Sequence, residues 1–174
     1  SSGEVVKAPK PLKLALRRLQ IRSRRVSRKL EAAKEAAGFG RHALLPKGTR
    51  LPVSNNRQKS AATLARLHAR IANIRADFIH KLTTRLCREN QALVIEDFNV
   101  KAMLENEKLA RSISDVGFGM FRSQMEYKAT RYRTRLVIAD RWYPSSRLCS
   151  VCGWKNEALT LQDREWVCVE CGTH

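Results

Sequence analysis

The chain has 174 residues and a hydrophobic content of 43%, which allows one domain with a real core plus a small module. No apolar run approaches the roughly 20 residues that a membrane-spanning helix needs. The 34 Lys and Arg residues outnumber the 16 Asp and Glu residues, and the resulting net charge of +18 is typical of proteins that bind a polyanion.

The positive charge lies almost entirely in the first half. Residues 1–90 carry 22 basic and 5 acidic residues, a net charge of +17, whereas residues 91–174 carry 12 and 11, a net charge of +1. Nucleic acid is the first candidate partner. An anionic membrane is the second, but the basic stretches are poor in the Trp and Phe expected at a lipid interface, so we expect no membrane partner. The alternative is that these charges only keep a helix solvated, but such a helix usually carries both signs of charge.

A long basic helix is predicted after an extended or disordered lead-in of residues 1–9. Beyond Pro11, apolar side chains recur at spacings of four and three up to Gly38, a typical residue to end a helix. The stripe consists of Leu12, Leu16, Leu19, Ser23, Val26, Leu30, Ala33 and Ala37. Around it lie Arg17, Arg18, Arg22, Arg24, Arg25, Arg28 and Lys29. Residues 38–56 contain several Gly and Pro residues and predict a loop.

A second amphipathic helix is predicted from about residue 58 to about residue 90, with Cys87 as a half-buried thiol. Its apolar stripe consists of Leu64, Leu67, Ile71, Ile74, Phe78, Leu82 and Leu86. Two such helices joined by a loop predict an antiparallel hairpin with an apolar seam and basic outer faces. On the second helix, the predicted outer residues are Arg66, Arg70, Arg75, Lys81 and Arg85. These residues and the basic residues of the first helix are the candidate nucleic-acid contacts.

Short apolar runs alternate with helical patterns in the second half. Residues 92–95 and 136–139 predict two buried strands. Residues 99–111 are polar and expected to be mobile. Ser112 and Asp115 resemble a capping box that opens one helix running to about residue 135. The residues predicted to face inward from this helix are Phe118, Phe121, Met125, Ala129 and Tyr132.

Four cysteines near the C-terminus form the pattern C-x2-C-x15-C-x2-C. Two C-x2-C turns can direct four sulfurs at one point, as in structural zinc sites, and the glycines that follow, Gly153 and Gly172, suit a left-handed turn. We predict a closed zinc ribbon whose ligands are Cys149, Cys152, Cys168 and Cys171. Two disulfides are the alternative, but the chain shows no secretory signal, and C-x2-C pairs recur in metal sites.

Glu96 directly follows the first predicted strand. The C-terminal ends of strands in α/β sheets are where sites assemble, and a carboxylate there is costly unless it is solvated, paired or bound to a metal. From the spacing alone, a functional acid and an ordinary solvent-exposed residue are equally supported. Asp97 points the other way in an extended strand and is the weaker candidate.

Several blocks, in order, resemble the TnpB (OrfB) insertion-sequence family, which is similar to compact type V CRISPR effectors and Fanzor proteins. They are DFIHKLTT at 77–84, VIED at 94–97, SISDVGFG at 112–119, YKA at 127–129 and PSS-x-x-C-S-x-C-G at 144–153. The resemblance covers about residues 73–172. It implies an RNA-guided DNA endonuclease with a RuvC-like, RNase H-type domain, into which a zinc ribbon is inserted.

The resemblance gives Glu96 the role of the middle acid among three carboxylates that hold two Mg²⁺ ions. The family's first acid is expected before this chain begins and its last acid just after it ends. We therefore expect a fragment that is inactive by itself. There are two alternatives to a fragment. The chain could be a decayed transposon copy, or other segments could complete its fold. The implied partners are DNA and a guide RNA, in the prokaryotic cytoplasm at the nucleoid.

The expected fold is α/β: a partial RNase H-like (RuvC) domain with a basic antiparallel helical hairpin and an inserted four-cysteine zinc ribbon. The expected boundaries are 10–90 for the hairpin, 91–143 for the RuvC-like segment and 144–174 for the ribbon. The alternative function is a zinc-stabilised, nucleic-acid-binding or ribosome-associated scaffold without catalysis. That alternative does not predict the acid-ended strand or the blocks around Asp115 and Tyr127.

Overall fold

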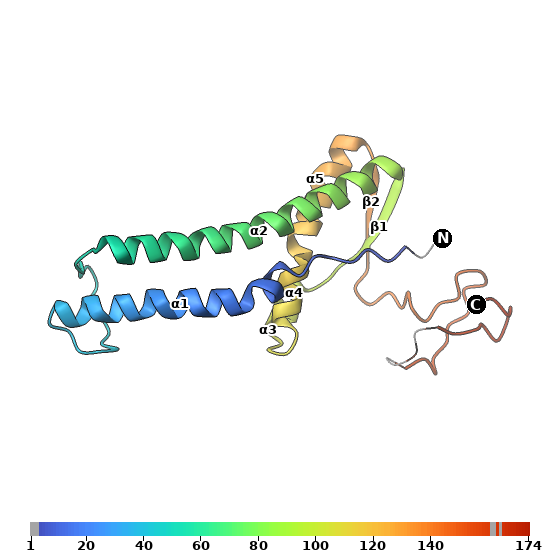
Figure 1. The fold of residues 1–174 in the computed structure, drawn as a ribbon. Helices are drawn as coiled ribbons and strands as arrows, with labels where there is room; N and C mark the ends of the chain where they lie inside the picture. Colours follow the sequence, from blue (N-terminus) through green and yellow to red (C-terminus); the bar gives the residue numbers. More distant parts are fainter. Residues whose placement is uncertain (1–3, 161–162, 164) are drawn as a thin grey trace. The chain divides into compact units, whose positions relative to one another are not determined.

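The computed structural model describes residues 4–160, 163 and 165–174. The described chain divides into two compact units, one containing the residues up to Leu93 together with Phe98–Leu136, the other containing Val94–Asp97 and the residues from Val137 onward. The elements, in chain order, are α1 (Pro11–Ala36), α2 (Asn55–Glu89), β1 (Ala92–Glu96), α3 (Val100–Glu105), α4 (Ala110–Val116), α5 (Phe118–Tyr132) and β2 (Arg135–Ala139) (Figure 1). Residues 4–9 form no helix or strand, as expected, and residues 1–3 lie outside the described residues.

The helices α1 and α2 run antiparallel side by side, so the predicted helical hairpin is confirmed (Figure 1). Pro11 occupies the first turn of α1, where its missing N–H costs nothing. The helix α2 begins three residues earlier than predicted because the Ser54 hydroxyl accepts a hydrogen bond from the backbone N–H of Arg57 and caps the helix. Leu19, Leu67 and Ile71 form the seam, and burying such a side chain stabilises the fold by about 1.5–3 kcal/mol.

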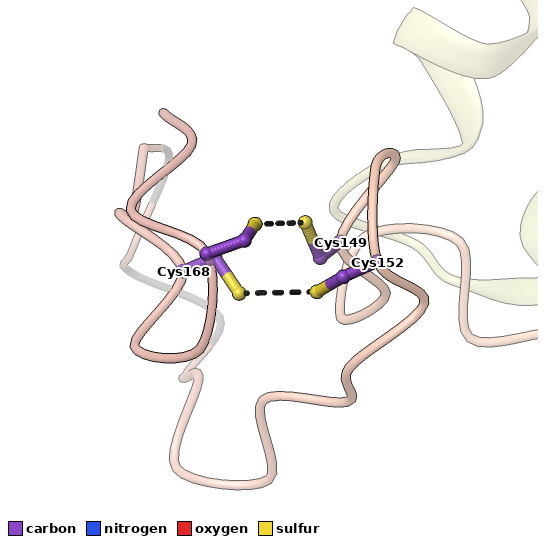
Figure 2. A group of neighbouring side chains, drawn as sticks. Cys149, Cys152 and Cys168 are labelled. Carbon is purple, nitrogen blue, oxygen red and sulfur yellow. Dashed lines mark hydrogen bonds between the residues drawn. The ribbon is translucent and has the colours of Figure 1, made fainter.

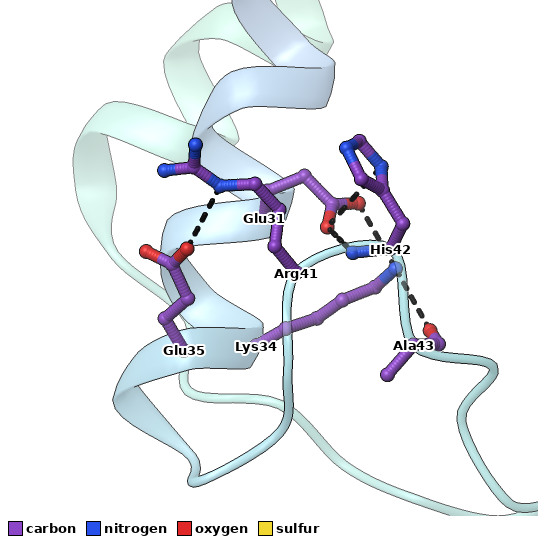
Figure 3. A network of polar contacts seen from close by, with 6 residues as sticks. All are labelled: Glu31, Lys34, Glu35, Arg41, His42 and Ala43. Atoms are coloured by element: carbon purple, nitrogen blue, oxygen red, sulfur yellow. Dashed lines mark hydrogen bonds and ion pairs between the residues drawn. The ribbon is translucent and has the colours of Figure 1, made fainter.

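The chain leaving α1 folds back onto the last turns of that helix (Figure 3). The Glu31 carboxylate accepts hydrogen bonds from the backbone N–H of His42, at 2.7 Å, and from the Lys34 ammonium, at 2.9 Å. These two donors lower the pKa of Glu31. Lys34 also donates to the carbonyl oxygen of Ala43, and Arg41 pairs with Glu35. The predicted loop is therefore tied to α1 by polar contacts.

The buried face of α2 changes along its length. The predicted stripe holds at Leu67 and Ile71, which face α1. Farther along, α2 packs against α5 and buries Ile79. The prediction that Ile74 faces inward is wrong, because its side chain is 40% exposed. The half-buried state predicted for Cys87 is also wrong, because this residue is only 3% exposed.

Gly117 divides the single helix predicted after residue 111 into α4 and α5. Its backbone is left-handed, with φ of +75°, and its N–H bonds to the carbonyl oxygen of Ile113. Ser112 lies inside α4, so the predicted capping box is wrong. The residues expected to be mobile form α3 and the start of α4, and the Asn99 side chain caps α3 by accepting from the backbone N–H of Ala102.

The strands β1 and β2 pair as a small parallel sheet. At the start of this pairing, the backbone N–H of Arg135 donates to the carbonyl oxygen of Gln91 at 2.8 Å. Both strands exist where the sequence predicts them, but the prediction that they are buried is wrong. Val94 is 68% exposed, and Val137 and Ile138 are exposed as well. The fold is mixed α/β as expected. Within the described ranges, no helix combines the length and the apolar character needed to cross a bilayer.

Candidate metal centre and nucleic-acid interface

The four predicted cysteine ligands come together in the second unit (Figure 2). Their sulfur atoms all lie within 4.8 Å of one another. The Sγ atoms of Cys149 and Cys171 are 3.5 Å apart, and those of Cys152 and Cys168 are 3.6 Å apart. Tetrahedral zinc with Zn–S bonds of about 2.3 Å requires sulfurs about 3.8 Å apart. The cluster therefore fits a metal such as zinc. The separations exceed the roughly 2.05 Å of a disulfide bond, and all four thiols are free.

Each cysteine pair sits on the same backbone turn. In the first, the N–H of Gly153 donates to the carbonyl oxygen of Cys149, whose own N–H donates to the carbonyl oxygen of Trp154. In the second, Gly172 donates to Cys168, and Cys168 donates to Thr173. Both glycines have positive φ, +74° and +67°, as predicted. The repeated C-x2-C-G sequence thus produces two matching knuckles.

Nearby donors and neighbouring sulfurs set the acidity of the thiols. Thr173, whose hydroxyl lies 3.3 Å from the Cys171 sulfur, lowers the pKa of Cys171 to about 6. Backbone N–H groups, first that of Cys152, also lower the pKa of Cys149. At Cys152 the backbone N–H of Trp154 acts in the same direction, but desolvation and the other sulfurs outweigh it and raise the pKa to about 12. Zinc binds thiolates, so donors of this kind favour the ligand form.

Two tryptophans support the ribbon. The rings of Trp154 and Trp166 lie 6.1 Å apart between centroids at a tilted angle. The indole N–H of Trp166 donates to the carbonyl oxygen of Ser146. The predicted ribbon residues 161, 162 and 164 lie outside the described residues.

Glu96 ends β1 with an exposed carboxylate, and the Ser145 hydroxyl lies 3.5 Å from one of its oxygens. The next residue, Asp97, accepts a 2.7 Å hydrogen bond from Arg141, which follows β2. Asp97 therefore ties the two strand ends together, while Glu96 faces solvent. In the part of the chain that the structure describes, the cysteine cluster is the one group of three or more His, Cys, Asp or Glu that could hold a metal ion. Glu96 belongs to no such group among the described residues.

The basic residues predicted to contact nucleic acid separate into two groups. Eight are exposed: Arg17, Arg18, Arg24, Arg25, Arg28, Arg66, Arg70 and Lys81. The other four are half-buried and contact other residues of the fold: Arg22, Lys29, Arg75 and Arg85. The placement of Arg75 on an outer face is wrong, because its side chain is 19% exposed and lies against Asp115.

A basic pocket of about 230 Å³ lies between α1 and α2. Arg22, Arg25 and Lys29 line it from α1, and Lys59 from α2. Among the described residues that line it, none is acidic. Lys59 was missed because the sequence places it at the very start of the second helix, before the periodic stripe indicates which side faces the first.

Asp115 is a buried acid whose partners the sequence does not reveal. Its two carboxylate oxygens accept hydrogen bonds, each 2.9 Å long, from the backbone N–H groups of Leu12 and Lys13. Arg75 approaches the same carboxylate at 3.5 Å and donates to the backbone carbonyl oxygen of Asp115. Lys10, the N-cap residue of α1, provides no side-chain cap. Asp115 therefore caps α1 from another helix and complements the positive end of that helix.

Lys128 is a second buried charge that sequence reasoning missed. The residue is only 2% exposed, and its ammonium donates to the carbonyl oxygen of His80 and to the hydroxyls of Thr83 and Thr84, at 2.7–2.8 Å. Burial lowers the pKa of Lys128. The residue sits in the YKA block, and this block is the signal that could have directed attention to it.

Comparisons with known proteins agree with the sequence blocks. Residues 1–107 match the OrfB_IS605 family model, described as "Probable transposase", and residues 118–174 match the Cas12f1-like TNB domain model. A Streptomyces pristinaespiralis protein named "Putative RNA-guided DNA endonuclease" is 44% identical over 172 residues, which cover 99% of this chain and 37% of the relative.

Two further relatives carry the same description. A Mycobacterium tuberculosis protein is 33% identical over 184 residues, covering 98% of this chain and 34% of the relative. Escherichia coli InsQ is 32% identical over 130 residues, which cover 66% of this chain and 32% of the relative. The chain spans about a third of the length of these curated relatives. The first family model matches more than half of the chain, which therefore belongs to the OrfB (TnpB) family of probable transposases.

Proposed function

We propose that the chain is the nucleic-acid-binding portion of a TnpB-like, RNA-guided DNA endonuclease, in which Glu96 is one of three acids that hold Mg²⁺. The observation that carries the proposal is family membership combined with an exposed glutamate at the end of a parallel strand. The partners of such an endonuclease are DNA and a guide RNA. It acts in the prokaryotic cytoplasm, at the nucleoid. The 174 residues alone are proposed to be inactive in cleavage.

The hairpin is proposed to supply affinity for the sugar-phosphate backbone. Its exposed arginines lie on α1 and α2, and a guanidinium matches two phosphate oxygens at once. Such contacts position nucleic acid without reading its sequence, so recognition of the target is left to base pairing with a guide. The small basic pocket lined by Arg25 and Lys59 has the size and charge for a phosphate group.

Glu96 is proposed to act as an oxygen ligand within a partial RuvC-like domain over residues 91–143. Carboxylates are the ligands that Mg²⁺ prefers, and an exposed one at a strand end is free to bind. Bound Mg²⁺ would activate the attacking water and stabilise the leaving 3′ oxygen. The hydroxyl of Ser145 lies close enough to orient the carboxylate. Two further acids from outside these 174 residues complete the proposed site, while the ribbon at 144–174 has a structural role.

The test compares cleavage with binding in a protein in which this chain is joined to the flanking segments of its family. The variant Glu96→Gln keeps the shape of the side chain and removes its charge. We expect guide-directed DNA cleavage to fall at least about 100-fold, while guide and target binding change less than twofold, because metal ligation contributes several kcal/mol to the transition state. Glu105→Gln, an exposed acid on α3, is the matched control and should cleave normally. Cleavage at the normal rate by Glu96→Gln would show that Glu96 is not a metal ligand.

A scaffold without catalysis is the second candidate, favoured because Glu96 belongs to no group of three or more possible metal ligands among the described residues. Nucleic acid that co-purifies with the protein separates the two. A short guide-like RNA supports the nuclease, whereas ribosomal RNA supports the scaffold.

A further inference from the structure

A pocket of about 570 Å³ lies between the C-terminal half of α2 and α5, within the first unit. Its size falls in the range of about 300–1,000 Å³ that ligands of small-molecule size occupy. The pocket is distinct from the α1–α2 seam and from the basic pocket near Lys59. Its lining combines cations with tyrosine rings, which separates it from a surface that is merely basic.

Five of the lining residues are basic, and one, Glu89, is acidic. Lys81 pairs with Asp77, and Arg85 pairs with Glu4. In the described part of the chain, no carboxylate forms an ion pair with either of two other lining residues, Arg88 on α2 and Arg131 on α5. These two guanidiniums have their charge available for an anionic ligand, and both are exposed.

Contacts within the first unit hold two of the cations that line the pocket. Arg88 lies over the ring of Tyr132, 5.4 Å from its centroid, so its guanidinium is already held in place. Lys128 lines the pocket with an ammonium held by neutral oxygen atoms, which fix its position without cancelling its charge. Groups held in this way lose little conformational entropy when a ligand binds.

A tyrosine ring supplies a stacking surface. Tyr127 lines the pocket and is 51% exposed although it lies on a helix that buries its neighbours, Lys128 and Ala129. The Lys128 ammonium lies 6.0 Å from the Tyr127 ring centroid. Exposed aromatic rings beside cations are the means by which proteins bind unpaired bases, because every base has a flat face that is accessible only outside a duplex.

We propose that this pocket binds one unpaired nucleotide of a single-stranded nucleic acid, with the base stacked on Tyr127 and the phosphate bound by Arg88 and Arg131. The proposal rests on the nucleic-acid-binding function proposed above and gives it a specific single-stranded site. Single-stranded RNA and single-stranded DNA share the chemistry that the pocket recognises. Duplex DNA does not offer an unstacked base and is excluded by this geometry.

The test measures binding of the 174-residue chain to fluorescent ten-nucleotide single-stranded RNA, single-stranded DNA and the corresponding duplex DNA. Tyr127→Leu removes the ring and keeps an apolar side chain. We expect affinity for a single strand to fall about 5- to 150-fold, while affinity for the duplex is unchanged. Tyr143→Leu, which alters an exposed tyrosine of the second unit, is the matched control. A loss confined to RNA or to single-stranded DNA identifies which of them occupies the pocket.

Arg88→Ala and Arg131→Ala test the phosphate contacts. Each should make the slope of log affinity against log salt shallower by up to about 0.7 for the single strand, with Arg50→Ala in the hairpin loop as the control. Circular dichroism of every variant should match that of the wild type, because the altered side chains are exposed. Equal weakening of duplex and single strand, or no weakening, would overturn the pocket and leave the proposed function standing. Failure of the wild-type chain to bind any nucleic acid would overturn both.

Discussion

Two buried charged side chains, Asp115 and Lys128, each bind groups on another helix. Asp115 caps α1 from α4, and Lys128 holds the hydroxyls of α2 from α5. Both charges lie within sequence blocks that resemble the TnpB family. Their roles could not be predicted from the sequence, because the partners lie roughly 40 to 100 residues away and backbone groups leave no pattern in the sequence. Each of the two residues therefore links two helices of the first unit.

Replacing Asp115 is expected to destabilise the first unit. Asp115→Ala leaves two N–H groups of α1 without an acceptor and leaves the half-buried Arg75 without its anion. We expect the free energy of unfolding in urea to fall by about 2 kcal/mol or more. Asp77→Ala, which breaks the exposed pair with Lys81, should cost less than about 1 kcal/mol. Equal losses for the two variants would contradict the capping role.

Lys128 gives a prediction about pH. Burial lowers its pKa, so between that value and the ordinary lysine pKa of about 10.4 the unfolded chain binds more protons than the folded chain. Stability contributed by this residue therefore rises with pH across that window. Burial also raises the pKa of the neighbouring Cys87 thiol, and the charge of Lys128 partly offsets that rise, so both proteins in this comparison carry Cys87→Ala. Subtracting the stability of Lys128→Met from that of the protein that retains Lys128, by urea titration from pH 7 to pH 10, should isolate the rise. A flat difference would contradict it.

Among the helices and strands, the sequence predicts the type of most elements but not which side of each element is buried. The helices α1 and α2 were predictable because a long apolar stripe leaves one arrangement that buries it. The change of buried face within α2 was not, because it depends on where α1 and α5 begin along α2. The strands were predictable from four-residue apolar runs, but such runs do not reveal that the small sheet leaves Val94 and Val137 exposed. The ribbon was predictable in most detail, because C-x2-C-G encodes both ligands and turn.

The break between α4 and α5 depends on Gly117. A Cβ added there would lie 2.9 Å from side-chain carbons of both Arg75 and Ile79, and the backbone is left-handed. Gly117→Ala should therefore lower the free energy of unfolding by more than about 1 kcal/mol. Gly119→Ala is the matched control two residues later, where a Cβ meets nothing within 4 Å inside a helix. It should stabilise by up to about 1 kcal/mol. Thermal melts should show a lower melting temperature for Gly117→Ala and an equal or higher one for Gly119→Ala. A similar fall in both variants would contradict the role of the Gly117 backbone.

Metal removal is expected to unfold the ribbon and leave the helices intact. All three tryptophans lie in the second unit, whereas all the helices of the described chain lie in the first. A chelator, or Cys152→Ser, should therefore change tryptophan emission while the helical circular dichroism signal stays. Cys87→Ser serves as the thiol control, because this residue lies outside the cluster, and it should leave tryptophan emission unchanged. Loss of both signals together would contradict the structural independence of the ribbon.

Across the whole molecule, the positive charge and the candidate metal ligands occupy different parts of the chain. The first 90 residues carry nearly all the net positive charge, and the exposed arginines lie on α1 and α2. The zinc-type cluster and Glu96 lie in the second unit. This separation follows from composition and was predictable. The exposure of individual cations was not, because Arg22, Arg75 and Arg85 find partners that only the fold brings near.

We propose that this chain binds nucleic acid through phosphate contacts of the exposed arginines on α1 and α2. The most direct measurement is its affinity for a short duplex DNA and a short RNA as a function of salt concentration. We predict a linear fall of log affinity with log salt, of about 0.7–0.9 for each phosphate neutralised. The triple variant Arg24→Ala, Arg25→Ala, Arg28→Ala should show a shallower slope, while the control triple Lys101→Ala, Lys108→Ala, Arg111→Ala keeps the wild-type slope. Affinity that does not depend on salt, or equal slopes in all three proteins, would contradict the claim.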